Sequence, residues 1–175
     1  IYDVAYVGSF SEEEGDRRRN LLKALAERFP NAKIGRFWPR DMASIYGQSK
    51  IVVNACHNRD VNMRVFEAMA SGALLITDEA DGLEDLFTDG RHLVVYRNDG
   101  ALLDLVARYL EEDAARERIA RAGCAEVLQQ HTYTHRVEEM MRITKQALGA
   151  ARLLGDRKSK NSEYYEHPRR ELIQN

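Results

Sequence analysis

The chain has 175 residues, 44% hydrophobic and 31% charged, with 26 Lys and Arg against 28 Asp and Glu. This composition is typical of a soluble globular domain and excludes a disordered chain. The near balance of charge gives no reason to expect nucleic acid or an anionic membrane as a partner. No apolar run reaches the length of a membrane span and no secretory signal is visible, so we expect a cytoplasmic location. The absence of an initiator Met before Ile1 suggests a piece of a longer protein.

Apolar runs alternate with helical patterns over about the first 95 residues. We expect strands at 4–7, 32–37, 51–55, 74–77 and 92–96, and helices at 17–28, 40–47 and 63–71, with a helical turn at 82–87. Asp16 is placed to cap the first helix, and Asn62 is placed to cap the third. The strands lack alternation of apolar and polar residues, which indicates burial on both faces.

The remainder of the chain has helical spacing of apolar residues at 100–110, 114–130 and 134–154. Strands that alternate with helices favour a parallel sheet. We therefore predict an α/β fold: a Rossmann-like, doubly wound parallel sheet of about five or six strands, with helices on both faces and a C-terminal helical extension.

Ligands of such sheets bind at the carboxyl ends of the strands. Gly8 and Ser9 end the first strand, where a glycine lets a phosphate approach the backbone, although a plain turn has about even odds. The chain has neither a G-x-G-x-x-G sequence nor a Walker A sequence, so neither a dinucleotide fingerprint nor an NTPase loop is supported.

Arginines occupy first turns of two helices, where a cation opposes the helix dipole. Arg17, Arg18 and Arg19 begin the first helix, and one of them facing a diphosphate would explain this choice. The alternative is a solvated run of charges paired with the glutamates at 12–14. Arg64 lies in the first turn of the third helix, where an anion would again explain it and a surface ion pair is the alternative.

Glu67 lies one turn after Arg64, among apolar neighbours. A carboxylate in such company needs a partner or a place on the rim, because burying it alone is costly. The alternative is an ordinary exposed glutamate. The acids at 78, 79, 81 and 85 lack the spacing of a calcium loop, and His57 beside Cys56 is no ligand pattern, so we expect no metal. Cys56 and Cys124 are expected to be reduced core residues.

Three segments carry a resemblance to a known family. They are Phe66–Gly72 (FEAMASG), Ala73–Thr77 (ALLIT) and Gly82–Phe87 (GLEDLF), supported by the helices from Leu102 and the run from His131 to Thr134. Over about residues 3 to 150 the chain resembles the C-terminal half of group-1 retaining glycosyltransferases of the GT-B fold. Within that group it looks most like the spore-maturation (CgeB-type) branch.

The resemblance implies a donor site for a nucleoside diphosphate sugar, of UDP or GDP type, with no other cofactor. The family carries two glutamates spaced E-x(7)-E; Glu67 matches the second, which holds the ribose, whereas the first falls on Arg59. Gly8 matches the diphosphate turn, and Trp38 with Phe37 falls where the family holds the base. Asn62 and Arg64, with Arg59 and Asp60, would supply sugar or phosphate contacts. We take Gly8, Ser9, Arg18, Trp38, Asn62, Arg64 and Glu67 as the candidate site.

The resemblance also implies a domain at 1–150 and a linker or helical tail at 151–175. Residues 155–161 are polar like a linker. Residues 164–173 resemble the lead-in to a class I S-adenosylmethionine methyltransferase domain, with an ordinary charged helical tail as the alternative. A fused methyltransferase domain and an N-terminal acceptor-binding half are thus expected, and without that half the piece is expected to be inactive.

Two other interpretations of the chain remain. One is a non-catalytic module of the same fold. The other is a receiver-like or flavodoxin-like domain, which does not account for FEAMASG.

Overall fold

The computed structural model describes residues 1–9, 16–56 and 59–163, with side chains described as far as residue 149. The chain divides into two units, of which the first spans Ile1–Thr132 and the second begins at Tyr133. The first unit contains the whole sheet and every candidate site residue.

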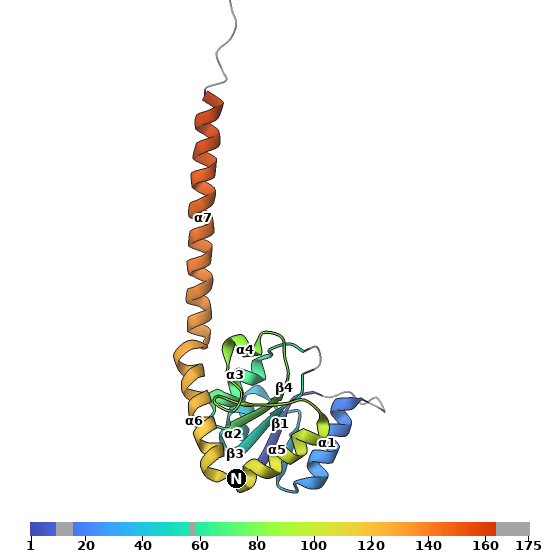
Figure 1. The fold of residues 1–175 in the computed structure, drawn as a ribbon. Coiled ribbons are helices and arrows are strands. Elements are labelled where there is room, and N and C mark those ends of the chain that lie inside the picture. Colours follow the sequence, from blue (N-terminus) through green and yellow to red (C-terminus); the bar gives the residue numbers. More distant parts are fainter. Residues whose placement is uncertain (10–15, 57–58, 164–175) are drawn as a thin grey trace, which may run out of the picture. The chain divides into compact units, whose positions relative to one another are not determined.

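The sheet has five parallel strands: β1 (Tyr2–Val7), β2 (Ala32–Gly35), β3 (Ser49–Asn54), β4 (Leu74–Asp78) and β5 (Val94–Tyr96). Their order across the sheet is β2-β1-β3-β4-β5, and each neighbouring pair is parallel (Figure 1). The predicted doubly wound α/β fold is confirmed, with five strands. The second and fifth strands are shorter than predicted, because β2 ends at Gly35 and β5 begins at Val94.

Helices cover both faces of this sheet. One core cluster joins the sheet to α1 (Arg17–Arg28) and α5 (Asp99–Glu111), and the other joins it to α2 (Pro39–Gly47), α3 (Met63–Ala70) and the short α4 (Leu83–Leu86). Helix α6 (Asp113–Gln130) contributes side chains to both clusters. Both sides of every central strand are therefore buried.

The strand sequences follow from this double burial. In β3, Ile51 and Val53 belong to one core cluster and Val52 to the other, and all three are fully buried. Each such side chain contributes roughly 1.5–3 kcal/mol by leaving water. Successive strand residues point to opposite faces, so a strand covered on both sides is apolar throughout instead of alternating.

Both predicted helix caps are present. Asp16 accepts a hydrogen bond from the backbone N–H of Arg19 at 2.9 Å, and Asn62 accepts one from the backbone N–H of Arg64 at 3.1 Å. Each satisfies an N–H that has no partner within its helix. These caps set the points at which α1 and α3 begin, directly after the loops at the carboxyl edge of the sheet.

The C-terminal segment is helical. Helix α7 runs from Tyr133 to Glu163 and includes residues 155–161. Their polar character fits a solvated helix, since a helix with no proline can be polar all round. The domain limit predicted at residue 150 stays a prediction, although the first unit ends at Thr132. The segment 164–173, with its resemblance to a methyltransferase, lies outside the described residues. Within the described residues, no helix is both long and apolar enough to cross a membrane.

Candidate functional site

The sheet order locates the candidate site between β1 and β3. The chain places β2 on one side of β1 and then places β3 on the other side. The connections on the two sides therefore diverge at the carboxyl ends of β1 and β3 and leave a crevice there, which is where ligands bind in open α/β sheets. The end of β1 carries Gly8, and α3 begins after the loop that follows β3.

Arg64 lies at this divergence and is held by three contacts with two strands, β1 and β3. Its Nε donates a hydrogen bond to the carbonyl oxygen of Val7 at 2.7 Å, and its Nη1 donates one to Oδ1 of Asn54 at 2.6 Å. The guanidinium stacks over the ring of the fully buried Tyr6, 4.7 Å from its centroid. The first turn of α3 thus presents a fixed positive charge between the ends of β1 and β3.

Gly8 is required by this arrangement. A Cβ atom at Gly8 would lie 2.2 Å from Nη2 of Arg64 and 3.0 Å from the hydroxyl of Tyr6. The backbone N–H of Gly8 donates to the carbonyl of Gly35 at 3.0 Å, which extends the pairing of β1 with β2. The glycine therefore allows the strand end and the cation to touch, which any larger residue would prevent.

Asn62 connects the helix start to the strand end. Besides capping α3, it donates from Nδ2 to Oδ1 of Asn54 at 3.3 Å. That same Asn54 oxygen accepts from Arg64, so one strand-end amide orients both side chains. The contacts of Asn62 in this structure are with the protein, and its role toward a ligand stays a prediction.

Glu67 follows Arg64 on α3 at a spacing of three residues, which places the two side chains on neighbouring positions of the helix surface. Burial raises the pKa of Glu67 above its usual range, and the positive charge of Arg64 acts in the opposite direction. Burial also raises the pKa of Tyr46 to about 12, against the effect of Arg64. Glu67 is thus a half-buried carboxylate able to accept hydrogen bonds from a ligand hydroxyl.

The structure distinguishes between the arginines of α1. Arg17 donates from Nη2 to Oδ1 of Asp99 at 2.6 Å and lies 3.8 Å from Asp78, which ties the start of α1 to the start of α5. Arg18 has a buried Nε with no hydrogen-bond partner in the described part of the chain. Arg17 therefore has a structural partner, whereas the role of Arg18 toward an anion stays a prediction. The glutamates at 12–14, the alternative partners for these arginines, lie outside the described residues.

Ser9 and Trp38 are less closely connected to Arg64. Ser9 is exposed, and its carbonyl accepts from the Tyr6 hydroxyl at 3.3 Å. Trp38 is 72% exposed at the start of α2, and its side chain makes no ring contact with another described residue. An exposed indole is available for stacking, but its role as a base platform stays a prediction.

Sequence reasoning missed Asn54 and Tyr6. Asn54 is fully buried and also donates to Oγ1 of Thr77 at 3.1 Å, so it joins β3, β4 and α3. The signal was present, since an asparagine that ends an otherwise apolar buried strand needs hydrogen-bond partners. Tyr6 carried no comparable signal, because a tyrosine in a buried strand is usually a core residue.

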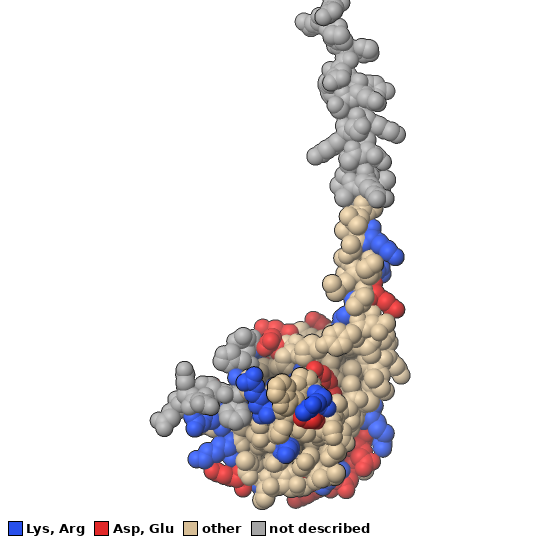
Figure 2. Space-filling view, turned by 180° about the vertical axis from the view of Figure 1, so that it is seen from behind, with Lys and Arg blue, Asp and Glu red and all other residues tan. Residues whose placement is uncertain are grey.

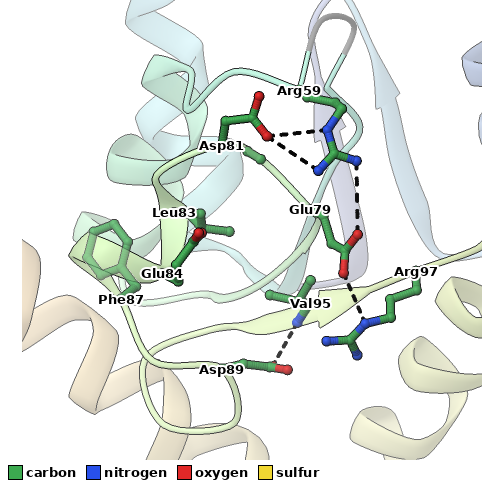
Figure 3. Close-up of a pocket in the computed structure, with 10 residues that line it drawn as sticks. Arg59, Glu79, Asp81, Leu83, Glu84, Phe87, Asp89, Val95 and Arg97 are labelled. Atoms are coloured by element: carbon green, nitrogen blue, oxygen red, sulfur yellow. Dashed lines mark hydrogen bonds and ion pairs between the residues drawn. The ribbon is translucent and has the colours of Figure 1, made fainter.

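A second group of charges lies at the ends of β4 and β5. Figure 3 shows an alternating row of Asp81, Arg59, Glu79 and Arg97. The three closest approaches between their charged atoms are 3.3, 4.0 and 3.0 Å in that order. Arg59, Glu79 and Arg97 line two neighbouring cavities of about 340 and about 400 Å³. We call these four residues the charge row.

Surface charges, possible metal ligands and the two cysteines do not indicate a further site. Figure 2 shows acidic and basic side chains both represented on the face of the first unit that it presents. Among the described residues, no group of three or more His, Cys, Asp or Glu side chains is arranged to hold a metal ion. Cys56 and Cys124 are free and half-buried, and burial raises the pKa of Cys56 to about 12, so its thiol is protonated at neutral pH.

Residues 17–142, more than half of the chain, match the family described as glycosyl transferase-like. The chain belongs to this family. The match begins at the first helix and includes Arg64, Glu67 and the whole charge row. No curated protein sequence matches the chain.

Several solved structures share this fold. HepE from Anabaena, in complex with UDP and glucose, superposes with a TM-score of 0.69 at 14% identity, over 83% of this chain and 48% of that one. Sucrose-phosphate synthase from Thermosynechococcus elongatus superposes with a TM-score of 0.65 at 13% identity, over 85% of this chain and 46% of that one. The C-terminal domain of the group 1 glycosyltransferase LpcC from Francisella tularensis superposes with a TM-score of 0.58 at 18% identity, over 75% of this chain and 87% of that one.

These superpositions show the fold, which is that of one Rossmann-like domain of a GT-B glycosyltransferase. The chain spans less than half the length of the sucrose-phosphate synthase and HepE chains that it matches. It covers most of LpcC, which was solved as an isolated C-terminal domain. The predicted glycosyltransferase family and fold are therefore confirmed, while the role of each site residue stays a prediction.

Proposed function

We propose that this chain is the donor-binding domain of a glycosyltransferase and binds a nucleoside diphosphate sugar of UDP or GDP type. The observation that carries the proposal is the fixed position of Arg64 between β1 and β3, in contact with Gly8 and one turn before Glu67. A cation and a carboxylate at these positions suit the diphosphate and the ribose of one ligand.

Each predicted site residue has a role in this proposal. Gly8 and Ser9 provide the backbone turn beside the diphosphate, and Arg18 and Arg64 provide positive charge. Asn62 presents the start of α3, whose N-terminal N–H groups favour an anion. Two further roles complete the assignment: Glu67 accepts the ribose hydroxyls, and Trp38 stacks on the base.

The chemistry that follows is glycosyl transfer. As the glycosyl group leaves, negative charge grows on the departing diphosphate, and guanidinium groups already in place lower the energy of that transition state. Because Arg64 is held by Val7 and Asn54, little reorganisation is needed when the charge develops. We propose that the reaction retains the anomeric configuration, as in the spore-maturation (CgeB-type) branch.

Support for the ligand class comes from the structural neighbours. HepE was crystallised with UDP-glucose and with UDP, and a TarM variant was crystallised with UDP. The acceptor would be bound by a separate N-terminal half, which together with this domain would complete the enzyme. A fused methyltransferase domain stays a prediction from residues 164–173.

Calorimetry tests the ligand class directly. We expect the chain to bind UDP and UDP-glucose, or GDP and GDP-mannose, and the better pair identifies the base. Glu67→Ala removes the proposed ribose contact, so we expect about a tenfold loss of affinity. Glu117→Ala, which alters an exposed glutamate on α6, is the matched control and should bind as the parent does. A folded sample that binds none of the four compounds would overturn the proposal.

A second candidate, a non-catalytic module of the same fold, is favoured by one observation. Arg59 stands where the family has its first glutamate, and its guanidinium pairs with Asp81 and Glu79 instead of acting as an acid. Transfer activity of the full-length protein distinguishes the two candidates. Activity that Glu67→Ala leaves unchanged would favour the non-catalytic module, and activity that falls with nucleotide affinity would favour the enzyme.

A further inference from the structure

Three arginines and three carboxylates line one cavity of about 400 Å³. The arginines are Arg17 from α1, Arg59 from the loop before α3 and Arg97 after β5, and the carboxylates are those of Asp78, Glu79 and Asp99. Small-molecule sites have volumes of about 300–1,000 Å³, so the cavity suits part of a ligand. It lies at the carboxyl ends of β4 and β5, apart from the Gly8–Arg64 contact between β1 and β3.

Arg59 is loosely paired, and both Arg59 and Arg97 have exposed side chains. The guanidinium of Arg59 is 3.3 Å from Asp81 and 4.0 Å from Glu79, whereas charge-assisted hydrogen bonds are about 2.7–2.9 Å long. Nε of Arg97 approaches Oε1 of Glu79 to 3.0 Å. The side chains of Arg59 and Arg97 are 64% and 69% exposed. Pairs so exposed contribute little to stability, so a ligand anion can replace them at small cost.

The backbone fixes Arg59 at this place. Its φ of 54° lies in the left-handed region, and its carbonyl accepts from the N–H of Asp81 at 2.8 Å. A residue with a Cβ atom adopts this backbone conformation at an energetic cost, whereas glycine adopts it without that cost. A long cationic side chain held in this conformation at a cavity is the kind of strain found at ligand sites.

We propose that Arg59 and Arg97 form a subsite for a carboxylate on the glycosyl group of the donor, which would make the donor a nucleoside diphosphate uronic acid. The inference rests on the proposed function. Two guanidinium groups beside one shared carboxylate, Glu79, match a second carboxylate in fork geometry. In the bound state the ligand carboxylate takes N–H donors of Arg59 and Arg97, while Glu79 and Asp81 turn toward solvent.

The neighbouring cavity has further carboxylates in its lining, which would attract a cationic sugar. Glu84 and Asp89 line the cavity of about 340 Å³ together with the charge row. Oδ1 of Asp89 is engaged by the backbone N–H of Val95 at 2.9 Å, which reduces its availability to a ligand. An amino sugar is therefore the competing ligand chemistry, and the experiment includes one.

The test compares donors that differ only at the sugar. Affinities of the 175-residue chain are measured by calorimetry for UDP, UDP-glucose, UDP-glucuronate and UDP-glucosamine, and for GDP, GDP-mannose and GDP-mannuronate. We expect the uronate to bind about tenfold more tightly than the neutral sugar on the same nucleotide, the effect of one charge-assisted contact. Arg59→Gln and Arg97→Gln should each remove most of that preference and leave UDP or GDP affinity unchanged.

The controls keep the outcomes separable. Arg121→Gln alters an exposed arginine at the opposite end of the sheet and should preserve the preference. If Arg59→Gln does not fold, Arg59→Lys, which keeps the charge without the fork, should retain part of the preference. Nucleotide binding without uronate preference, a preference for the amino sugar, or a preference unaffected in the folded Arg59 and Arg97 variants would overturn this inference alone. Failure of every nucleotide to bind would overturn the proposed function and this inference together.

Discussion

Two arginines at the carboxyl edge of one sheet are held in opposite ways. Arg64 is half-buried, makes hydrogen bonds of 2.7 and 2.6 Å to Val7 and Asn54, and stacks on Tyr6. Arg59 is exposed, and its charged partners lie 3.3 and 4.0 Å away. The first is fixed by its contacts with β1 and β3, and the second is a member of a row of surface charges.

The difference indicates two modes of anion recognition. A cation fixed by neutral carbonyl and amide oxygens keeps its full charge and is oriented before a ligand arrives, so little ordering is required on binding. A cation in loose ion pairs exchanges one carboxylate for another, so it selects among ligands without contributing much to stability. We expect Arg64 to set affinity for the nucleotide and Arg59 to set preference among sugars.

Removal of the fixed cation should have the largest effect. Arg64→Met keeps much of the side-chain length but removes the charge and leaves Asn54 without its 2.6 Å donor. Hydrogen bonds to charged groups contribute about 1.5–3 kcal/mol, so we expect the affinity for UDP or GDP to fall about 10–100-fold. Calorimetry measures this affinity. Arg121→Met serves as the matched control. Unchanged affinity in a folded Arg64→Met sample would show that Arg64 does not face the diphosphate.

Displacement of the same cation should have a smaller effect. In Gly8→Ala the new methyl group would overlap Nη2 of Arg64, whose flexible end can move aside. We expect affinity for UDP or GDP to fall about tenfold because the guanidinium is no longer held in place. Gly47→Ala is the control, since a Cβ atom there meets only the carbonyl of Ser71 at 3.8 Å. If both variants bind equally well, the contact between Gly8 and Arg64 is unimportant for the ligand.

Removal of the loosely paired Arg59 side chain should increase the stability of the domain. Arg59→Gly relieves the left-handed backbone and loses only exposed ion pairs. We expect the free energy of unfolding to rise by about 0.5–1 kcal/mol, the cost of φ > 0 less the entropy that glycine adds to the unfolded chain. Urea denaturation measures this change. A variant less stable than the parent would show that the charge row stabilises the loops after β3 and β4, and the proposed contrast would fail.

Glu67 should give the smallest effect on stability, and the size of that effect depends on pH. Because burial raises its pKa in the folded state, the folded chain binds this proton more tightly than the unfolded chain. The contribution of Glu67 to stability is therefore greatest at low pH and is lost as pH rises from its usual value of 4.5 through the raised pKa.

The isosteric variant Glu67→Gln removes this titration. We expect its melting temperature relative to the parent to increase between about pH 4 and about pH 7, while nucleotide affinity falls. Thermal scans at both pH values measure the difference. A relative melting temperature that decreases over this range would mean that Arg64 stabilises the charged carboxylate more than burial destabilises it.

Much of the fold was predictable because its signals are local. Asp16 and Asn62 cap the helices expected to follow them, and every strand of the sheet contains most of a predicted apolar run. The ends of β2 and β5 were overestimated, because strand ends depend on which neighbour the backbone pairs with. The polar stretch at 155–161 left a linker and a helical tail as alternatives, because composition alone does not separate a solvated helix from an extended chain.

The sequence by itself determined the doubly wound fold and the helix that carries Arg64 and Glu67 through the periodicity of apolar residues, and a few short motifs carried the resemblance to the family. Only the tertiary structure decided which cations are engaged. Arg17 meets Asp99 across 82 residues, and Arg64 meets Val7 across 57. Such contacts depend on the order of strands in the sheet, which brings distant segments to one edge and has no counterpart in local spacing.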